Sequence, residues 1–212
     1  MPELVEMLEN SSRNHSHLCP KQILGVRIGL AGTTAVGLEP QPAGKRLVVI
    51  LECYGCFADG VIAATGCCVG HRNLRVEDYG KVAATFVNVE TRQAVRVTPK
   101  LDVRERALKW ASEEPRHYFA QMQAYQIMPD EELLNFRQVE LKPTIDEILS
   151  RPGLRVNCDI CGEEITNERE IIRDGQVLCK ACAGRSYYRP VIVSASGTIA
   201  DVVKPEAEGS TD

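Results

Sequence analysis

Four cysteines near the C-terminal end of the sequence form two CxxC pairs, and 17 residues separate the pairs. They are Cys158, Cys161, Cys179 and Cys182. This spacing is typical of a structural zinc site, in which each pair forms a tight turn that directs both sulfurs toward one ion. Between the pairs, Asp174-Gly175 is a hairpin-turn signal with apolar residues on both sides. We therefore expect a four-cysteine zinc-binding module over residues 154–190. Free thiols or two disulfides are the alternative.

The rest of the chain is long enough for one sizeable domain before this module. The chain has 212 residues and 44% of them are apolar, so it can bury a core without a partner. Pro152-Gly153 interrupts a short helical segment that begins near Thr144, which places the domain boundary near residue 150. We expect a core domain over 1–150 and a disordered acidic tail over 205–212.

Charge, hydropathy and cysteine usage limit the partners and the compartment. The net charge of −4 disfavours an extended nucleic-acid surface. No apolar run approaches the ~18 residues of a membrane span, and the acidic start does not resemble a secretory signal. The nine cysteines are an odd number and occur in CxxC and adjacent pairs, which favours a reducing compartment. We therefore expect a cytoplasmic protein with no membrane partner.

Apolar patterning predicts a mixture of helices and strands in the first domain. Helices are expected over 2–14, 20–36, 56–65 and 103–126, the last one interrupted at Pro115; strands are expected over 46–52, 82–89 and 94–97. No regular alternation of strand and helix appears, so the predicted fold class is α+β. Gly25, Gly29 and Gly32 share one face of the second helix and indicate close packing against another backbone.

A second group of potential metal ligands lies in the first domain. His17 and Cys19 precede a helix that starts at Pro20, Cys56 and Asp59 start the next helix, and Cys67 follows the end of that helix. Thiolate, imidazole and carboxylate all bind zinc and related transition metals. We expect His17, Cys19 and Cys56 to be ligands, Cys67 to be a fourth, and Asp59 to bind the ion or orient His17.

Two other readings of these cysteines remain open at this point. Cysteine is often buried as a small apolar residue, and Cys68 fits that role. Cys53 and Cys56 form a CxxC pair that could act as a redox dithiol, although no thioredoxin-like pattern surrounds it.

The motifs of the first domain resemble those of the FmdE family, which takes its name from formylmethanofuran dehydrogenase. The resemblance rests on the following segments, in order: His17-x-Cys19-Pro20, Gly25, Arg27, Cys56-Phe57-Ala58-Asp59, Thr65-Gly66-Cys67, Gly70, Leu74, Asp78-Tyr79-Gly80-Lys81 and Ala83-Ala84-x-Phe86. The four-cysteine module is similar to a treble-clef zinc finger that some members carry.

The resemblance implies an α+β core, a homodimer, and metal binding by the matching motif residues. Those residues are His17, Cys19, Cys56, Asp59 and Cys67. The FmdE protein does not carry the catalytic molybdopterin of formylmethanofuran dehydrogenase, so the resemblance implies an accessory role beside oxidoreductase subunits. Lys21, Cys53 and Cys68 depart from the family pattern.

We therefore expect a metal-binding accessory or redox-associated protein with a structural zinc and a second ion, zinc being the expected one, in the core. A nucleic-acid-binding or regulatory zinc-finger protein is one alternative. A small enzyme of thiol or one-carbon chemistry is another. No catalytic residue can be assigned from the sequence.

Overall fold

The computed structural model describes residues 4–13, 17–40, 44–193 and 199–200. The chain divides into two compact units, Met1–Leu149 and Ser150–Asp212, which are described separately. The acidic tail expected over 205–212 lies outside the described residues. In the described ranges, no helix is both long and apolar enough to cross a bilayer.

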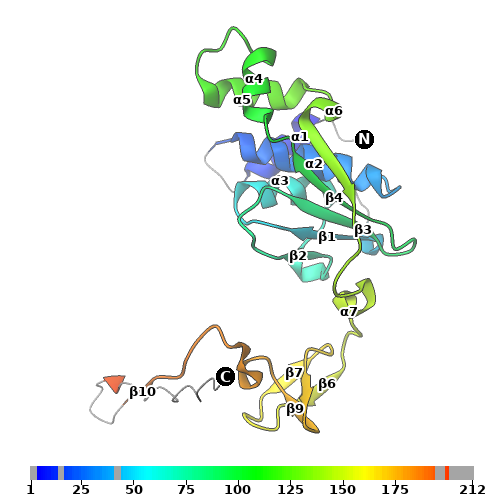
Figure 1. The fold of residues 1–212 in the computed structure, drawn as a ribbon, viewed down its shortest axis with the longest axis vertical. Coiled ribbons are helices and arrows are strands. Elements are labelled where there is room, and N and C mark those ends of the chain that lie inside the picture. The colour runs from blue at the N-terminus through cyan, green and yellow to red at the C-terminus, as the bar shows by residue number, and fades with distance from the viewer. Residues whose placement is uncertain (1–3, 14–16, 41–43, 194–198, 201–212) are drawn as a thin grey trace, which may run out of the picture. The chain divides into compact units, whose positions relative to one another are not determined.

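The first unit is built around a five-stranded sheet with the order β2-β1-β3-β4-β5 (Figure 1). The strands are β1 (Leu47–Leu51), β2 (Leu74–Val76), β3 (Ala84–Asn88), β4 (Ala94–Pro99) and β5 (Leu134–Gln138). β1 and β2 are parallel, and all other neighbouring pairs are antiparallel. The turn of the β3–β4 hairpin is at Val89–Thr91, between the two strands that the sequence predicts.

Side chains alternate between the two faces of this sheet. In β1, Leu47, Val49 and Leu51 belong to the large core cluster, whereas Val48 contributes to a smaller cluster on the other face. Both faces of the strand are therefore buried, which explains why it reads as a continuous apolar run.

Three helices cover the face with the large core, where Figure 1 shows them grouped against the sheet. They are α1 (Leu4–Ser12), α2 (Pro20–Ala35) and α3 (Cys56–Thr65). A Cβ atom on Gly32 would lie 2.2 Å from the ring of Phe86 in β3, so α2 can approach the sheet only because this residue is glycine. The expectation that the glycines of this helix serve packing is confirmed.

The opposite face carries a short helix, α7 (Ile145–Leu149). Its Ile145 and Ile148 pack with Val48, Val87 and Ala94 of the sheet. The carbonyl oxygen of its last residue, Leu149, accepts a hydrogen bond of 2.6 Å from Arg72. This contact holds the end of the first unit against the sheet domain.

The remaining helices lie between β4 and β5 in the sequence. They are α4 (Val103–Trp110), α5 (His117–Ile127) and α6 (Asp130–Leu133); two short helical turns, η1 (Gly44–Arg46) and η2 (Val69–His71), precede β1 and β2. The guanidinium of Arg27 in α2 donates to the carbonyl oxygens of Tyr125 and Met128 and to the carboxylate of Asp130, over 2.6–2.8 Å. Arg27 therefore joins α2 to the end of α5 and the start of α6.

The second unit contains two small hairpins followed by a helical turn. The first hairpin pairs β6 (Arg155–Asn157) with β7 (Glu164–Thr166), the second pairs β8 (Ile171–Arg173) with β9 (Gln176–Leu178), and η3 (Ala181–Arg185) follows. Asp174 and Gly175 both have positive φ, 52° and 80°, as the predicted hairpin turn requires. The last two strands, β10 (Ile192–Val193) and β11 (Ile199–Ala200), form a separate pair.

The α+β class is confirmed, and several predicted boundaries match the structure. α2 starts at Pro20, and α3 ends at Thr65 with Gly66 in the left-handed conformation. The predicted helix over 103–126 is two helices, because the chain leaves the helical conformation around Pro115. The sequence did not predict β2 or β5.

Candidate metal centres

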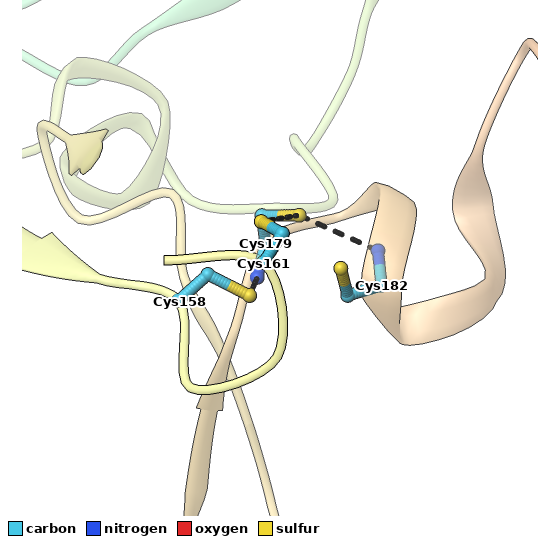
Figure 2. A group of neighbouring side chains, drawn as sticks. All are labelled: Cys158, Cys161, Cys179 and Cys182. Atoms are coloured by element: carbon cyan, nitrogen blue, oxygen red, sulfur yellow. Dashed lines mark hydrogen bonds between the residues drawn. The ribbon is translucent and has the colours of Figure 1, made fainter. Parts of the chain in front are cut away.

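The four cysteines of the second unit converge on one point (Figure 2). Their sulfur atoms all lie within 4.8 Å of one another, and the sulfurs of Cys161 and Cys179 are 3.9 Å apart. A tetrahedral zinc ion with Zn–S bonds of ~2.3 Å places its sulfurs ~3.8 Å apart, so the arrangement fits this ion. The site is a zinc-binding site with four cysteine ligands, as expected.

Each CxxC pair is shaped by backbone hydrogen bonds. The amide of Gly162 donates to the carbonyl of Cys158 over 2.9 Å, and Gly162 adopts a φ of 75° that favours glycine. The amide of Cys182 donates to the sulfur of Cys179 over 3.4 Å, and the amide of Cys179 donates to the sulfur of Cys158 over 3.3 Å. Amide donors of this kind stabilise thiolates, which are the form that binds zinc.

Backbone amide donors also determine the pKa of Cys158. Its pKa is lowered to about 6, first by the backbone amide of Cys161 and then by that of Cys179. The pKa of Cys182 is raised to about 12, chiefly by its hydrogen bond with the Cys179 thiol. When thiols lie this close, ionisation of one makes ionisation of its neighbours harder. A bound cation removes this effect and allows all four to become thiolates.

In the first unit, the packing of α2 against α3 determines which candidate ligands meet. A Cβ atom on Gly25 would lie 2.3 Å from the carbonyl oxygen of Phe57, and one on Gly60 would lie 2.3 Å from that of Gln22. Further along, Gly29 faces Val61 and Ala64. The contacts advance in the same direction on both helices, so α2 and α3 run parallel and their N-terminal ends lie together.

This parallel packing brings Cys19 and Cys56 close together. Cys19 is the residue before α2, and Cys56 is the first residue of α3. Burial, and then the neighbouring Cys19 thiol, raise the pKa of Cys56. Two helix N-termini also direct their positive dipole ends toward the pair, which favours a bound thiolate.

The neighbours of the pair include predicted and unpredicted residues. Asp59 lies one turn after Cys56 and is near enough to act on its pKa, and His17 is exposed two residues before Cys19. Tyr118 of α5 was not predicted: its hydroxyl donates to the carbonyl of Leu18 over 3.4 Å, and its pKa is raised by burial and by the two nearby thiols. Nothing in its sequence context signals this position.

Cys67 does not join this group, which corrects the expected set of four ligands. It follows the C-terminal end of α3, and the ten residues of that helix separate it from Cys56 by ~15 Å. Its side chain is fully buried in the core cluster and donates to the carbonyl of Leu47 over 3.8 Å. Cys67 is a core residue that packs against β1.

The candidate metal ligands of the first unit lie farther apart than the four cysteines of the zinc finger in the second unit. Across 4–13, 17–40, 44–193 and 199–200, the finger is the one group of three or more ligand side chains whose atoms lie within 4.8 Å of one another. His17 and Asp59 therefore flank the Cys19–Cys56 pair without closing a compact ligand set around it.

A cleft opens beside the first turn of α2. Its volume is about 490 Å³, and its walls come from α2, the segment before β3, β4, α4 and α5. Lys21, Lys81, Arg96, Lys100 and Arg104 contribute to the lining. This volume is in the range of small-molecule sites, which is roughly 300–1,000 Å³.

The fold and the cysteine cluster define a class of protein: an α+β domain followed by a four-cysteine zinc finger. Sequence comparison then identifies the family. The model of FmdE, "Molybdenum formylmethanofuran dehydrogenase operon", matches residues 14–152, and that of the prokaryotic dksA/traR C4-type zinc finger matches residues 152–188. The chain belongs to the FmdE family.

Two similar proteins extend this comparison. A protein of Archaeoglobus fulgidus named a probable S-adenosyl-L-methionine-binding protein is 30% identical, over 95% of this chain and 59% of its own length. The chain thus spans less than two thirds of that relative. The crystal structure of an FmdE-like protein of tungsten formylmethanofuran dehydrogenase, from Syntrophus aciditrophicus, superimposes with a TM-score of 0.54 at 23% identity, over 88% of this chain and 95% of that chain. The likeness supports the fold.

Proposed function

We propose that this protein is an accessory metal-binding protein with two metal sites of different character. The finger holds a structural zinc that shapes the second unit. The second site lies at the joined N-termini of α2 and α3, where Cys19 and Cys56 bind an ion and His17 or Asp59 supplies a third ligand. Zinc is the expected ion, because this donor set of sulfur, nitrogen and oxygen suits it.

The proximity of Cys19 and Cys56, close enough for the one thiol to raise the pKa of the other, is the observation that carries this proposal. The two residues come from segments 37 positions apart, and glycines at the helix crossing allow the approach. A site with two cysteine ligands and one less closely placed flanking ligand leaves a coordination position for water or substrate, which is the arrangement of a functional rather than a structural metal.

Metal analysis of Cys56→Ala tests the proposal. Protein purified without added metal should hold about two ions per chain, and Cys56→Ala should hold about one, with the finger intact. Cys68→Ala is the matched control, because Cys68 is a half-buried cysteine of the same domain outside the proposed ligand set. After cobalt substitution, Cys56→Ala should lose one of two sulfur-to-cobalt absorption bands. Full metal content in Cys56→Ala would refute the second site.

The same proposal includes assembly into a homodimer in the cytoplasm, beside the subunits of a partner oxidoreductase. Exposed apolar side chains on α4 and α5 support an interface: Trp110, Phe119 and Ile127 are 39%, 42% and 61% exposed. The mass in solution, measured by light scattering, should be twice that of the 23.4 kDa chain. A monomeric mass at micromolar concentration would contradict the dimer.

The name of the Archaeoglobus relative raises S-adenosylmethionine as a ligand, and the charge of the cleft argues against it. At neutral pH this molecule carries positive charges on its sulfonium and amino groups and one negative carboxylate, so its net charge is positive, and the cleft is lined by five basic side chains. Like charges in one cavity repel. Equilibrium dialysis with labelled S-adenosylmethionine should therefore show no binding at micromolar concentration.

A further inference from the structure

We propose that the cleft beside α2 binds a small polyanion, a molecule with two or more carboxylate or phosphate groups. This inference is independent of the second metal site. It rests on the charge of the lining, on the absence of ion pairs at four of its basic residues, and on the way in which the backbone holds two of them.

The lining of the cleft is far more basic than the chain as a whole. Five of its fifteen residues are Lys or Arg, and none is Asp or Glu. The complete chain, by contrast, has 25 basic and 29 acidic residues. A cavity walled by one sign of charge concentrates ions of the opposite sign.

Four of these five basic side chains form no ion pair in the described part of the chain. Arg96 is neutralised by Glu52, through a bidentate pair of 2.5 and 2.6 Å. The others are Lys21, Lys81, Lys100 and Arg104, and in the described part of the chain none of them forms an ion pair. Four positive charges without an ion-pair partner around one cavity repel one another, and a bound polyanion relieves that repulsion.

The chain holds two of these residues in place through its backbone. The amides of Tyr79 and Lys81 both donate to the carbonyl of Glu52, over 3.0 and 3.1 Å, so the segment that carries Lys81 is fixed to the end of β1. The amide of Lys100 donates to the carbonyl of Leu133 over 2.9 Å. Because these segments are fixed before a ligand arrives, little ordering opposes binding.

The remaining lining suits a small organic molecule rather than a free ion. Leu24, Ala83 and Val103 are buried apolar residues of the wall. Tyr125 donates its hydroxyl to the Gln121 side-chain oxygen over 3.3 Å, and the Gln121 nitrogen has no hydrogen-bond partner among the described residues. An apolar wall with an amide donor and a basic rim matches a carbon skeleton that bears several anionic groups.

Calorimetric titration tests the proposal with two ligands that bind metals weakly. Tricarballylate carries three carboxylates, and fructose 1,6-bisphosphate carries two phosphates; fructose is the uncharged control. The native protein should bind at least one of the anions, more weakly as salt increases, and should not bind fructose. Preference for one anion identifies carboxylate or phosphate as the recognised group. If neither binds at millimolar concentration in low salt, the proposal is wrong.

Two double variants with the same change in net charge locate the binding. Lys81→Gln with Arg104→Gln removes two charges from the cleft and should weaken binding by about tenfold or more. Lys45→Gln with Lys109→Gln removes two exposed charges outside the cleft, one of them also on α4, and should change the affinity by less than about twofold. Equal weakening in both variants would overturn the assignment to the cleft. Circular dichroism and metal content check that each variant is folded and loaded.

Discussion

Gly25 of α2 and Gly60 of α3 lie so close that a Cβ atom on Gly25 would be 3.0 Å from the Cα atom of Gly60. This contact holds the two helices parallel at short range. It is also the reason that Cys19 and Cys56, each at the start of its helix, meet at one end of the pair. The proposed core metal site therefore depends on two residues that have no side chain.

Replacement of Gly60 by alanine should separate the helices. The new Cβ atom would lie 2.3 Å from the carbonyl oxygen of Gln22, a backbone atom that cannot move alone. We expect a loss of about 2 kcal/mol in the free energy of unfolding, measured by urea denaturation, and a lower content of the second metal. Gly70→Ala is the control, because its Cβ would meet only the Cys68 sulfur at 4.0 Å. Similar stability of the two variants would show that the crossing tolerates a methyl group.

Glu52 and Arg96 form an ion pair that is largely shielded from solvent, since the Glu52 side chain is 9% exposed. Glu52→Gln should destabilise the first unit by about 2 kcal/mol, because Arg96 loses its charged partner in a partly buried place. Asp146→Asn breaks another bidentate pair, the one with Arg92 at the surface, and should have little measurable effect. Thermal unfolding of both variants checks the contrast, and an equal effect would contradict it.

Cys67 should behave as a core thiol rather than as a ligand. Burial raises its pKa to about 11 from 9.0, against a smaller opposing effect of the Thr65 hydroxyl. Because the folded pKa is above the unfolded value, the protonated thiol stabilises the fold fully below pH 9, and this contribution is lost as the pH rises toward 11.

The comparison of native protein with Cys67→Ala measures this effect. The difference in unfolding free energy between the two should shrink between pH 9 and 11, while the metal content stays the same. The other cysteines are common to both proteins, so their titration cancels. A difference that stays constant with pH would contradict the raised pKa, and the loss of an ion in Cys67→Ala would restore Cys67 to the list of ligands.

Loss of the finger zinc should affect the second unit alone. Cys161→Ser removes one sulfur from the site. Among the described residues, the small cluster beneath it has four buried members, Cys158, Ile165, Leu178 and Ala183. So small a core does not fold without its ion. Hydrogen exchange should show lost protection over 154–190 and unchanged protection over the first unit. Protected amides in 154–190 of the zinc-free variant would contradict this.

Much of the local structure of this protein was predictable from short stretches of sequence. Pro20 predicts the start of α2, and Gly66 predicts the end of α3, because each has a backbone preference that suits those positions. β2 escaped prediction because it has three residues and pairs in parallel with β1, without a hairpin turn to reveal it. β5 escaped because four of its five residues are exposed, so no alternation is present.

The sequence by itself determined the zinc finger, since all four ligands lie within 25 consecutive residues and short turns direct each pair. Only the tertiary structure decided which cysteines of the first domain meet. The parallel crossing of α2 and α3 joins Cys19 to Cys56 and leaves Cys67 at the far end, and the same fold gathers basic residues from separate segments around one cleft. The physical reason is the distance along the chain. The spacing of residues in the sequence fixes their geometry within one or two turns, whereas contacts between residues far apart in the sequence depend on how whole helices and strands pack.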